Sequence, residues 1–222
     1  MRSSCILIVL ASVALAAAPA RAQTSAAAPA RPAVDNRIPI AVVDARGVFA
    51  KLGQDEVTAA GLYTSALQMP SKAFGLTGGA HVYPWRGTSM AFGMGAEAIF
   101  ARRSFEPIDT ATLKPGGTVF NRRLSGISGQ LSLNFGHKLG WSYLTAGYGP
   151  LAFESHLAKL PPDGLREMTL NYGGGARWFN FDHMAFTVDL RFYATNPALA
   201  TPNTAARARH AVFVMSAGVA IK

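Results

Sequence analysis

The chain has 222 residues and a formal charge of +9, from 21 Lys and Arg against 12 Asp and Glu. Half of the residues are hydrophobic, but only 15% are charged, well below the roughly 25% of an ordinary soluble domain. The single cysteine, Cys5, excludes an intrachain disulfide framework and a cysteine-based zinc site. No run of about 18 apolar residues occurs, which argues against a membrane-spanning helix.

The first segment, residues 1–22, has the three parts of a signal peptide. Arg2 supplies a positive start, residues 5–17 are apolar but too short to span a bilayer, and Ala20-Arg21-Ala22 is a small-x-small cleavage site. We therefore predict an exported chain. Residues 23–37 are rich in Ala and Pro without an apolar period, which predicts a flexible periplasmic leader.

Apolar and polar residues alternate with period two through most of the remaining chain. The clearest segment is 183–193, where one face carries Met184, Phe186, Val188, Leu190 and Phe192. Alternation of this kind is typical of a β-strand, because a helix would scatter these residues around its surface. Eight strands are predicted, and the phase of the fifth is ambiguous: 38–50, 73–83, 89–102, 124–135, 141–149, 168–179, 183–193 and 210–221.

The connections between the predicted strands alternate in length. Short ones occupy 84–87, 136–140 and 180–182, and long ones occupy 51–72, 103–119, 150–167 and 194–209. An outer-membrane barrel with both termini in the periplasm has short periplasmic turns and long external loops in this order. The predicted fold is an all-β, eight-stranded antiparallel up-and-down transmembrane β-barrel spanning residues 38–222.

The composition of the two strand faces favours a membrane barrel over a soluble one. One face is rich in Gly, Ser, Ala and Thr, and we expect a narrow interior to have room only for small residues and a few paired charges. The other carries Met, Phe and Leu with Tyr and Trp near strand ends, as a lipid-facing belt does. The alternative is a soluble lipocalin-like barrel, in which the apolar face would line an interior ligand cavity.

This architecture resembles the small eight-stranded outer-membrane barrels of the OmpA and OmpX types. The resemblance covers residues 38–222 and implies insertion by the outer-membrane assembly machinery. Such barrels usually end in an aromatic residue, whereas this chain ends Val219-Ala220-Ile221-Lys222. Ile221 is the residue expected to take that role.

Six charged residues fall on the face predicted to line the lumen: Asp44, Arg46, Glu97, Arg177, Asp189 and Arg191. Three acids and three bases in a narrow tube must pair, because an isolated buried charge is very costly. We predict an ion-paired plug, assisted by Gln130, Asn134, Asn171 and His81. The alternative is a gated pathway through a rearranging network.

Basic residues gather at the predicted external end: Lys51, Lys72, Arg102, Arg103, Arg122, Arg123, Arg166, Arg207 and Arg209. Guanidinium groups match phosphate oxygens well. We hypothesise a rim that contacts outer-membrane lipid and lipopolysaccharide through Arg102, Arg103, Arg122, Arg123, Arg207 and Arg209. A merely solvated rim is the alternative, and export makes nucleic acid an unsuitable partner for this basic chain.

No catalytic or metal-binding pattern stands out in the sequence. Glu154-Ser155-His156 are adjacent, but neighbouring residues on a strand point apart and cannot form a triad. The histidines lack ligand spacing, so neither a metal nor a cofactor is expected. The predicted function is a monomeric, structural or adhesive outer-membrane barrel. The alternatives are a narrow porin-like channel, a lipid A-modifying enzyme and, if the chain is soluble, a binder of apolar ligands.

Overall fold

The structure is a computed structural model that describes residues 35–53, 70–106, 119–157, 166–197, 199, 206, 209 and 211–222. The chain divides into two units, Met1–Asp35 and Asn36–Lys222. The predicted signal peptide and nearly all of the predicted leader lie outside the described residues. The second unit contains the barrel.

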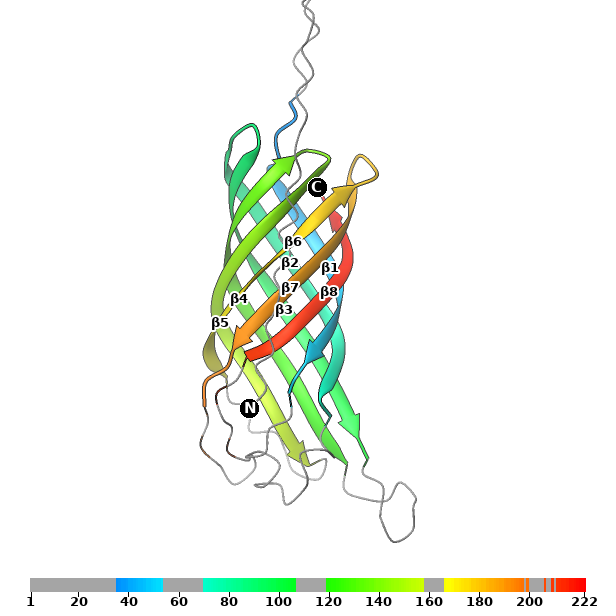
Figure 1. The fold of residues 1–222 in the computed structure, drawn as a ribbon, viewed down its shortest axis with the longest axis vertical. Coiled ribbons are helices and arrows are strands. Elements are labelled where there is room, and N and C mark those ends of the chain that lie inside the picture. The colour runs from blue at the N-terminus through cyan, green and yellow to red at the C-terminus, as the bar shows by residue number, and fades with distance from the viewer. Residues whose placement is uncertain are drawn as a thin grey trace, which may run out of the picture. The chain divides into compact units, whose positions relative to one another are not determined.

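Eight antiparallel strands form a closed barrel in chain order (Figure 1), with β1 paired to β8. The strands are β1 (Ala41–Lys51), β2 (Lys72–Arg86), β3 (Met90–Phe105), β4 (Phe120–His137), β5 (Gly140–Leu157), β6 (Glu167–Phe179), β7 (Met184–Ala194) and β8 (Ala211–Ile221). All eight correspond to predicted segments, and the fold-class prediction is confirmed.

Burial follows the predicted period of two. Along β7, residues of one parity face the lumen and are buried, and those of the other parity face outward. In β5, whose phase the sequence left open, Trp141, Tyr143 and Thr145 point inward. Leu144, between them, is 63% exposed on the outer surface.

Large apolar side chains cover the outside of the barrel. Leu76 is 70% exposed, and every strand carries at least one exposed large apolar side chain, from Val43 on β1 to Met215, Val219 and Ile221 on β8. A continuous apolar surface of this kind is far larger than the patches that a water-soluble monomer tolerates. The orientation is that of a lipid-facing belt, and it excludes the inverted, lipocalin-like arrangement.

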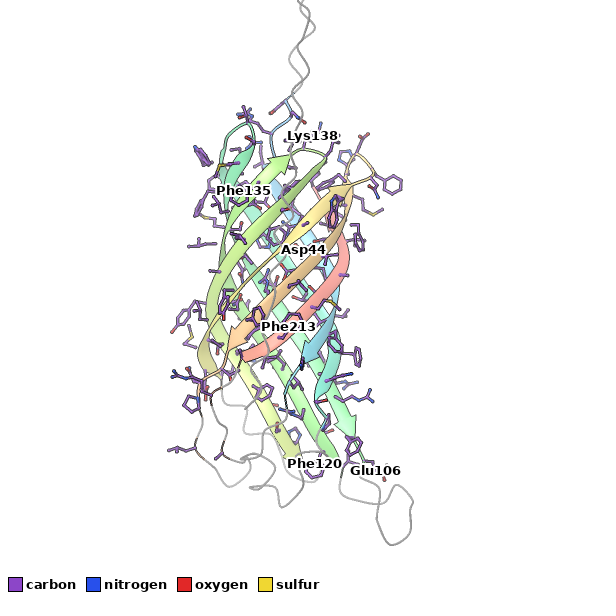
Figure 2. The ribbon with its side chains drawn as sticks, in the orientation of Figure 1. Asp44, Glu106, Phe120, Phe135, Lys138 and Phe213 are labelled. Atoms are coloured by element: carbon purple, nitrogen blue, oxygen red, sulfur yellow. The ribbon has the colours of Figure 1, made fainter. Side chains whose placement is uncertain are left out.

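The three short turns lie together at one end of the barrel, where Lys138 is labelled in Figure 2, and Glu106 and Phe120 lie at the opposite end. At that opposite end β3, β4 and β5 extend beyond the other strands (Figure 1). The predicted loops 103–119 and 150–167 were therefore too long, because pairing continues through Phe105↔Phe120 and Phe120↔Leu157. At the other end, β2 runs through the predicted turn to Arg86, with a register shift beside Pro84, which has no N–H to donate.

The lumen holds larger side chains than its glycine-rich sequence suggested. Tyr83, Trp141 and Phe179 fill the short-turn end, with the Trp141 and Phe179 rings stacked at 5.1 Å. A second apolar cluster, which includes Leu124 and Phe153, fills the other end. The expectation that only small and paired charged residues fit inside was wrong.

Inward glycines provide the space for these rings. A Cβ at Gly93 would lie 2.8 Å from the Tyr83 ring, and a Cβ at Gly175 would lie 2.6 Å from the Tyr143 hydroxyl. Both distances are too short for real atoms. Gly93 therefore lies against Tyr83, and Gly175 lies against Tyr143. Each glycine and its tyrosine together fill the space that two medium-sized side chains would otherwise share.

Candidate functional site: the lumen and the basic rim

The centre of the lumen is a cluster of carboxylates around Arg46. Its Nε donates to Asp44 Oδ1 at 2.9 Å, and its Nη1 lies 3.3 Å from Asp189 Oδ2. Its Nη2 donates to Glu97 Oε2. Figure 2 labels Asp44 near mid-height of the barrel. One guanidinium thus contacts three carboxylates from β1, β3 and β7.

Two further arginines complete the cluster. Arg191 contacts Glu97 Oε1 and Asp189 Oδ1, both at 2.8 Å. Arg177 donates to Asp44 Oδ2 at 2.6 Å. The structure therefore brings all six predicted lumen residues into one connected network, whose side chains are no more than 2% exposed.

Tyrosines extend this network in a way that the sequence did not predict. The Tyr143 hydroxyl donates to Asp189 Oδ2 at 2.7 Å, and Arg177 Nη1 donates to the Tyr83 hydroxyl at 3.0 Å. The Arg177 guanidinium also lies 4.6 Å from the centre of the Tyr143 ring. The only available signal was that Tyr83 shares the parity of the polar face of its segment, because the ambiguous phase of residues 141–149 gave none for Tyr143.

Uncharged polar residues fill the next level. Gln130 Nε2 donates to Asn171 Oδ1 at 3.0 Å and to Ser128 Oγ at 2.7 Å, and Thr145 donates to Gln130 Oε1 at 3.1 Å. His81 Nε2 lies 4.0 Å from Asp44 Oδ2. The other predicted assisting residue, Asn134, bonds to Ser132 Oγ and to the carbonyl oxygen of Ala91.

The network balances three acids against three bases, so its formal charge is zero when His81 is neutral. Balance matters because burial makes any uncompensated charge expensive. Apolar clusters close the lumen above and below the ions. This arrangement suits a filled, rigid barrel.

Exposed arginines stand at the ends of β3 and β4 that lie opposite the short turns. Arg102, Arg103 and Arg123 are exposed, as is Arg209, whereas Arg207 lies outside the described residues. Arg102 and Arg123 are direct cross-strand partners. The Arg123 guanidinium lies 5.0 Å from the centre of the Phe100 ring, which places this cation at the edge of the apolar belt.

Arg122 is not on the exposed rim, contrary to the prediction. It is 1% exposed, and its Nη1 donates to the carbonyl oxygens of Gly53 and Pro70, both at 2.8 Å. Its Nε donates to Ser155 Oγ at 3.2 Å. The parity of β4 explains the error, because Arg122 shares the inward phase of Leu124. Inside the barrel, Arg122 joins the two ends of the β1–β2 connection to β4.

The histidines among the described residues are scattered over the barrel. Among the described residues, no group of three or more His, Cys, Asp or Glu is placed to hold a metal ion. Over the same residues no helix is long and apolar enough to cross a membrane. His137 and His183 lie at the short-turn end, His81 lies in the lumen, and His156 lies on β5.

No protein-family profile and no curated protein matches the chain. Several solved structures do match it. The structure of Ail, the attachment invasion locus protein of Yersinia pestis, aligns with a TM-score of 0.50 and 10% identity, over 85% of this chain and 99% of that one. The chain has the fold of a small outer-membrane β-barrel.

Two further structures align with this outer-membrane barrel. One is Ail in complex with the heparin analogue sucrose octasulfate, with a TM-score of 0.49 and 11% identity, over 85% of this chain and 99% of that one. The other is outer membrane protein AlkL in DMPC lipid bilayers, with a TM-score of 0.43 and 15% identity, over 89% and 96%.

Proposed function

We propose that this protein is a monomeric integral outer-membrane barrel that acts through its outer surface. The observation that carries the proposal is the filled lumen: six buried charges neutralise one another, and apolar clusters close both ends. A channel needs a continuous polar path, and apolar clusters at both ends of the described lumen argue against one. The role left for such a barrel is structural or adhesive, through contacts made at the membrane surface and beyond.

Export and orientation form part of this proposal. Residues 1–22 are removed as a signal peptide, and the assembly machinery inserts the barrel with its short turns in the periplasm. The opposite end, with Arg102 and Arg123, then meets the outer leaflet. The lipopolysaccharide there carries phosphate groups at the level where the apolar belt ends.

Arg102 and Arg123 are the rim residues best placed to contact lipopolysaccharide. They stand directly opposite each other on adjacent strands, and like charges in this position repel. Neither makes an ion pair with any of the described residues. A phosphate between them would relieve the repulsion and accept the charge-assisted hydrogen bonds that guanidinium groups donate.

The test is a titration of the full chain in mild detergent with fluorescent lipopolysaccharide. Each basic residue near a membrane surface contributes about 1 kcal/mol to anionic lipid binding, so Arg102→Gln with Arg123→Gln should weaken binding roughly 25-fold. The control is Lys138→Gln, which removes a charge at the short-turn end and should leave binding unchanged. Equal binding by wild type and the double variant would refute this role of the rim.

A further inference from the structure

A hollow in the lipid-facing surface interrupts the apolar belt across β7, β8, β1 and β2. Its volume is about 590 Å³, and its lining is almost entirely apolar. Residues from all four strands line it: Gly47, Val48, Phe49, Phe74, Gly75, Val188, Met215, Ser216 and Ala217. Phe213, labelled on β8 in Figure 2, lies one outward position beyond Met215.

The hollow exists because small residues face lipid side by side. Gly47 pairs with Ala217 across β1 and β8, and a Cβ at Gly47 would meet nothing closer than the Ala217 carbonyl oxygen at 3.8 Å. Bulky residues stand in the adjacent row, where Phe49 and Phe74 pack edge to face at 5.5 Å. The result is a depression with aromatic walls and a floor of backbone.

Two lysines end two of the strands that line this depression. Lys51 and Lys72 are the outermost residues of β1 and β2, are exposed, and are direct cross-strand partners. Neither has an ion-pair partner in the described part of the chain. Lys51 is four residues beyond Gly47, or about 14 Å along the strand, so the cationic pair marks the outer end of the same apolar surface.

We propose that this surface is a specific seat for lipopolysaccharide, with a lipid A phosphate bound between Lys51 and Lys72 and an acyl chain in the hollow at Gly47 and Ala217. This proposal rests on the outer-membrane placement under the proposed function, but it uses a different face from Arg102 and Arg123. The two lysines match the phosphate of lipid A, and the apolar hollow matches one of its acyl chains. A second copy fits less well, because a two-fold symmetric contact would bring the lysine pair of one subunit against that of the other.

The experiment counts bound lipid A on the detergent-solubilised full chain by native mass spectrometry. Two double variants separate the two parts of the seat. Lys51→Gln with Lys72→Gln removes the phosphate contact, and about 1 kcal/mol per residue predicts roughly 25-fold weaker binding at this site. Gly47→Leu with Ala217→Leu fills the hollow and should abolish the same bound state. Ala96→Leu, a small residue facing lipid on β3, is the control that should change nothing.

Folding and the wider proposal are checked in the same experiment. Every variant should keep the heat-dependent mobility of a closed barrel in SDS gels, because all substituted side chains face outward. Loss of one lipid A in both double variants, with dephosphorylated lipid A failing to bind wild type at this site, supports the seat. If only the Arg102→Gln/Arg123→Gln variant loses lipid A, the seat is refuted and the rim contact stands. If wild type binds none, both proposals fail. A dimer that the Gly47→Leu/Ala217→Leu variant abolishes would also overturn the seat, because a second copy would then occupy the hollow.

Discussion

Replacing Arg46 by Met is the most direct test of the charge balance in the lumen. Arg46 contacts Asp44, Glu97 and Asp189, so the substitution leaves three buried carboxylates facing two arginines. Removing one partner from a buried ion pair costs about 3–5 kcal/mol, chiefly because the remaining charge is left uncompensated. We expect a loss of this size in the free energy of unfolding.

The assay is urea unfolding of the barrel in lipid vesicles, followed by tryptophan fluorescence. Trp141 reports on the lumen, where it is buried, while Trp85 and Trp178 are half exposed on the outer surface. A second substitution, Glu97→Gln, restores a net charge of zero and should recover much of the loss. A single variant that unfolds within about 1 kcal/mol of wild type, or a double variant less stable than the single, would refute the reasoning.

Three further predictions concern conductance through the lumen, the buried Arg122 and the inward Gly175. In planar bilayers the wild-type barrel should show no steady conductance, and stepwise single-channel currents would contradict the filled lumen. Arg122→Met should lower the free energy of unfolding by at least about 2 kcal/mol because it leaves buried carbonyl groups without a donor. The exposed Arg103→Met should stay within about 0.5 kcal/mol of wild type, and equal losses would argue against this role of Arg122. Gly175→Val should lower the gel-shift temperature, because the new side chain would clash with the Val188 carbonyl oxygen and with the Tyr143 hydroxyl. The outward Gly129→Ala, whose Cβ would meet nothing closer than a carbonyl oxygen at 4.0 Å, should not lower it.

Strand number and orientation could be predicted because the bilayer imposes a simple pattern. A strand between lipid and a narrow lumen must alternate apolar and polar side chains. The apolar residues of β7, from Met184 to Phe192 at every second position, therefore show directly which face is outward. β5 was ambiguous for a physical reason. Its inward residues Trp141 and Tyr143 are as apolar as its outward Leu144, since the lumen is lined by aromatic rings at that level.

The lumen cluster was predictable in membership but not in geometry. Parity and the cost of a lone buried charge select the six ionisable residues. Parity alone does not say how far along the barrel axis each side chain lies. The registers of β7 against β8 and of β8 against β1 decide which acid meets Arg46. The error at Arg122 is different: its inward phase was readable from the parity that it shares with the polar Ser128 and Gln130, but its position next to Arg123 in sequence suggested a shared exposed location.

The distribution of charge gives a physical reason to look for function on the outer surface. The six ions of the lumen cancel, so residues outside that network carry the entire net charge, which is +9 for the full chain and +7 once residues 1–22, with Arg2 and Arg21, are removed. Lys51, Lys72, Arg102 and Arg123 concentrate part of this charge on four consecutive strands, where the apolar belt ends. Cations placed side by side on a rigid sheet repel one another. Such an arrangement costs stability in the isolated barrel, and an anionic surface, such as the phosphates of an outer leaflet, would offset that cost by neutralising the cations.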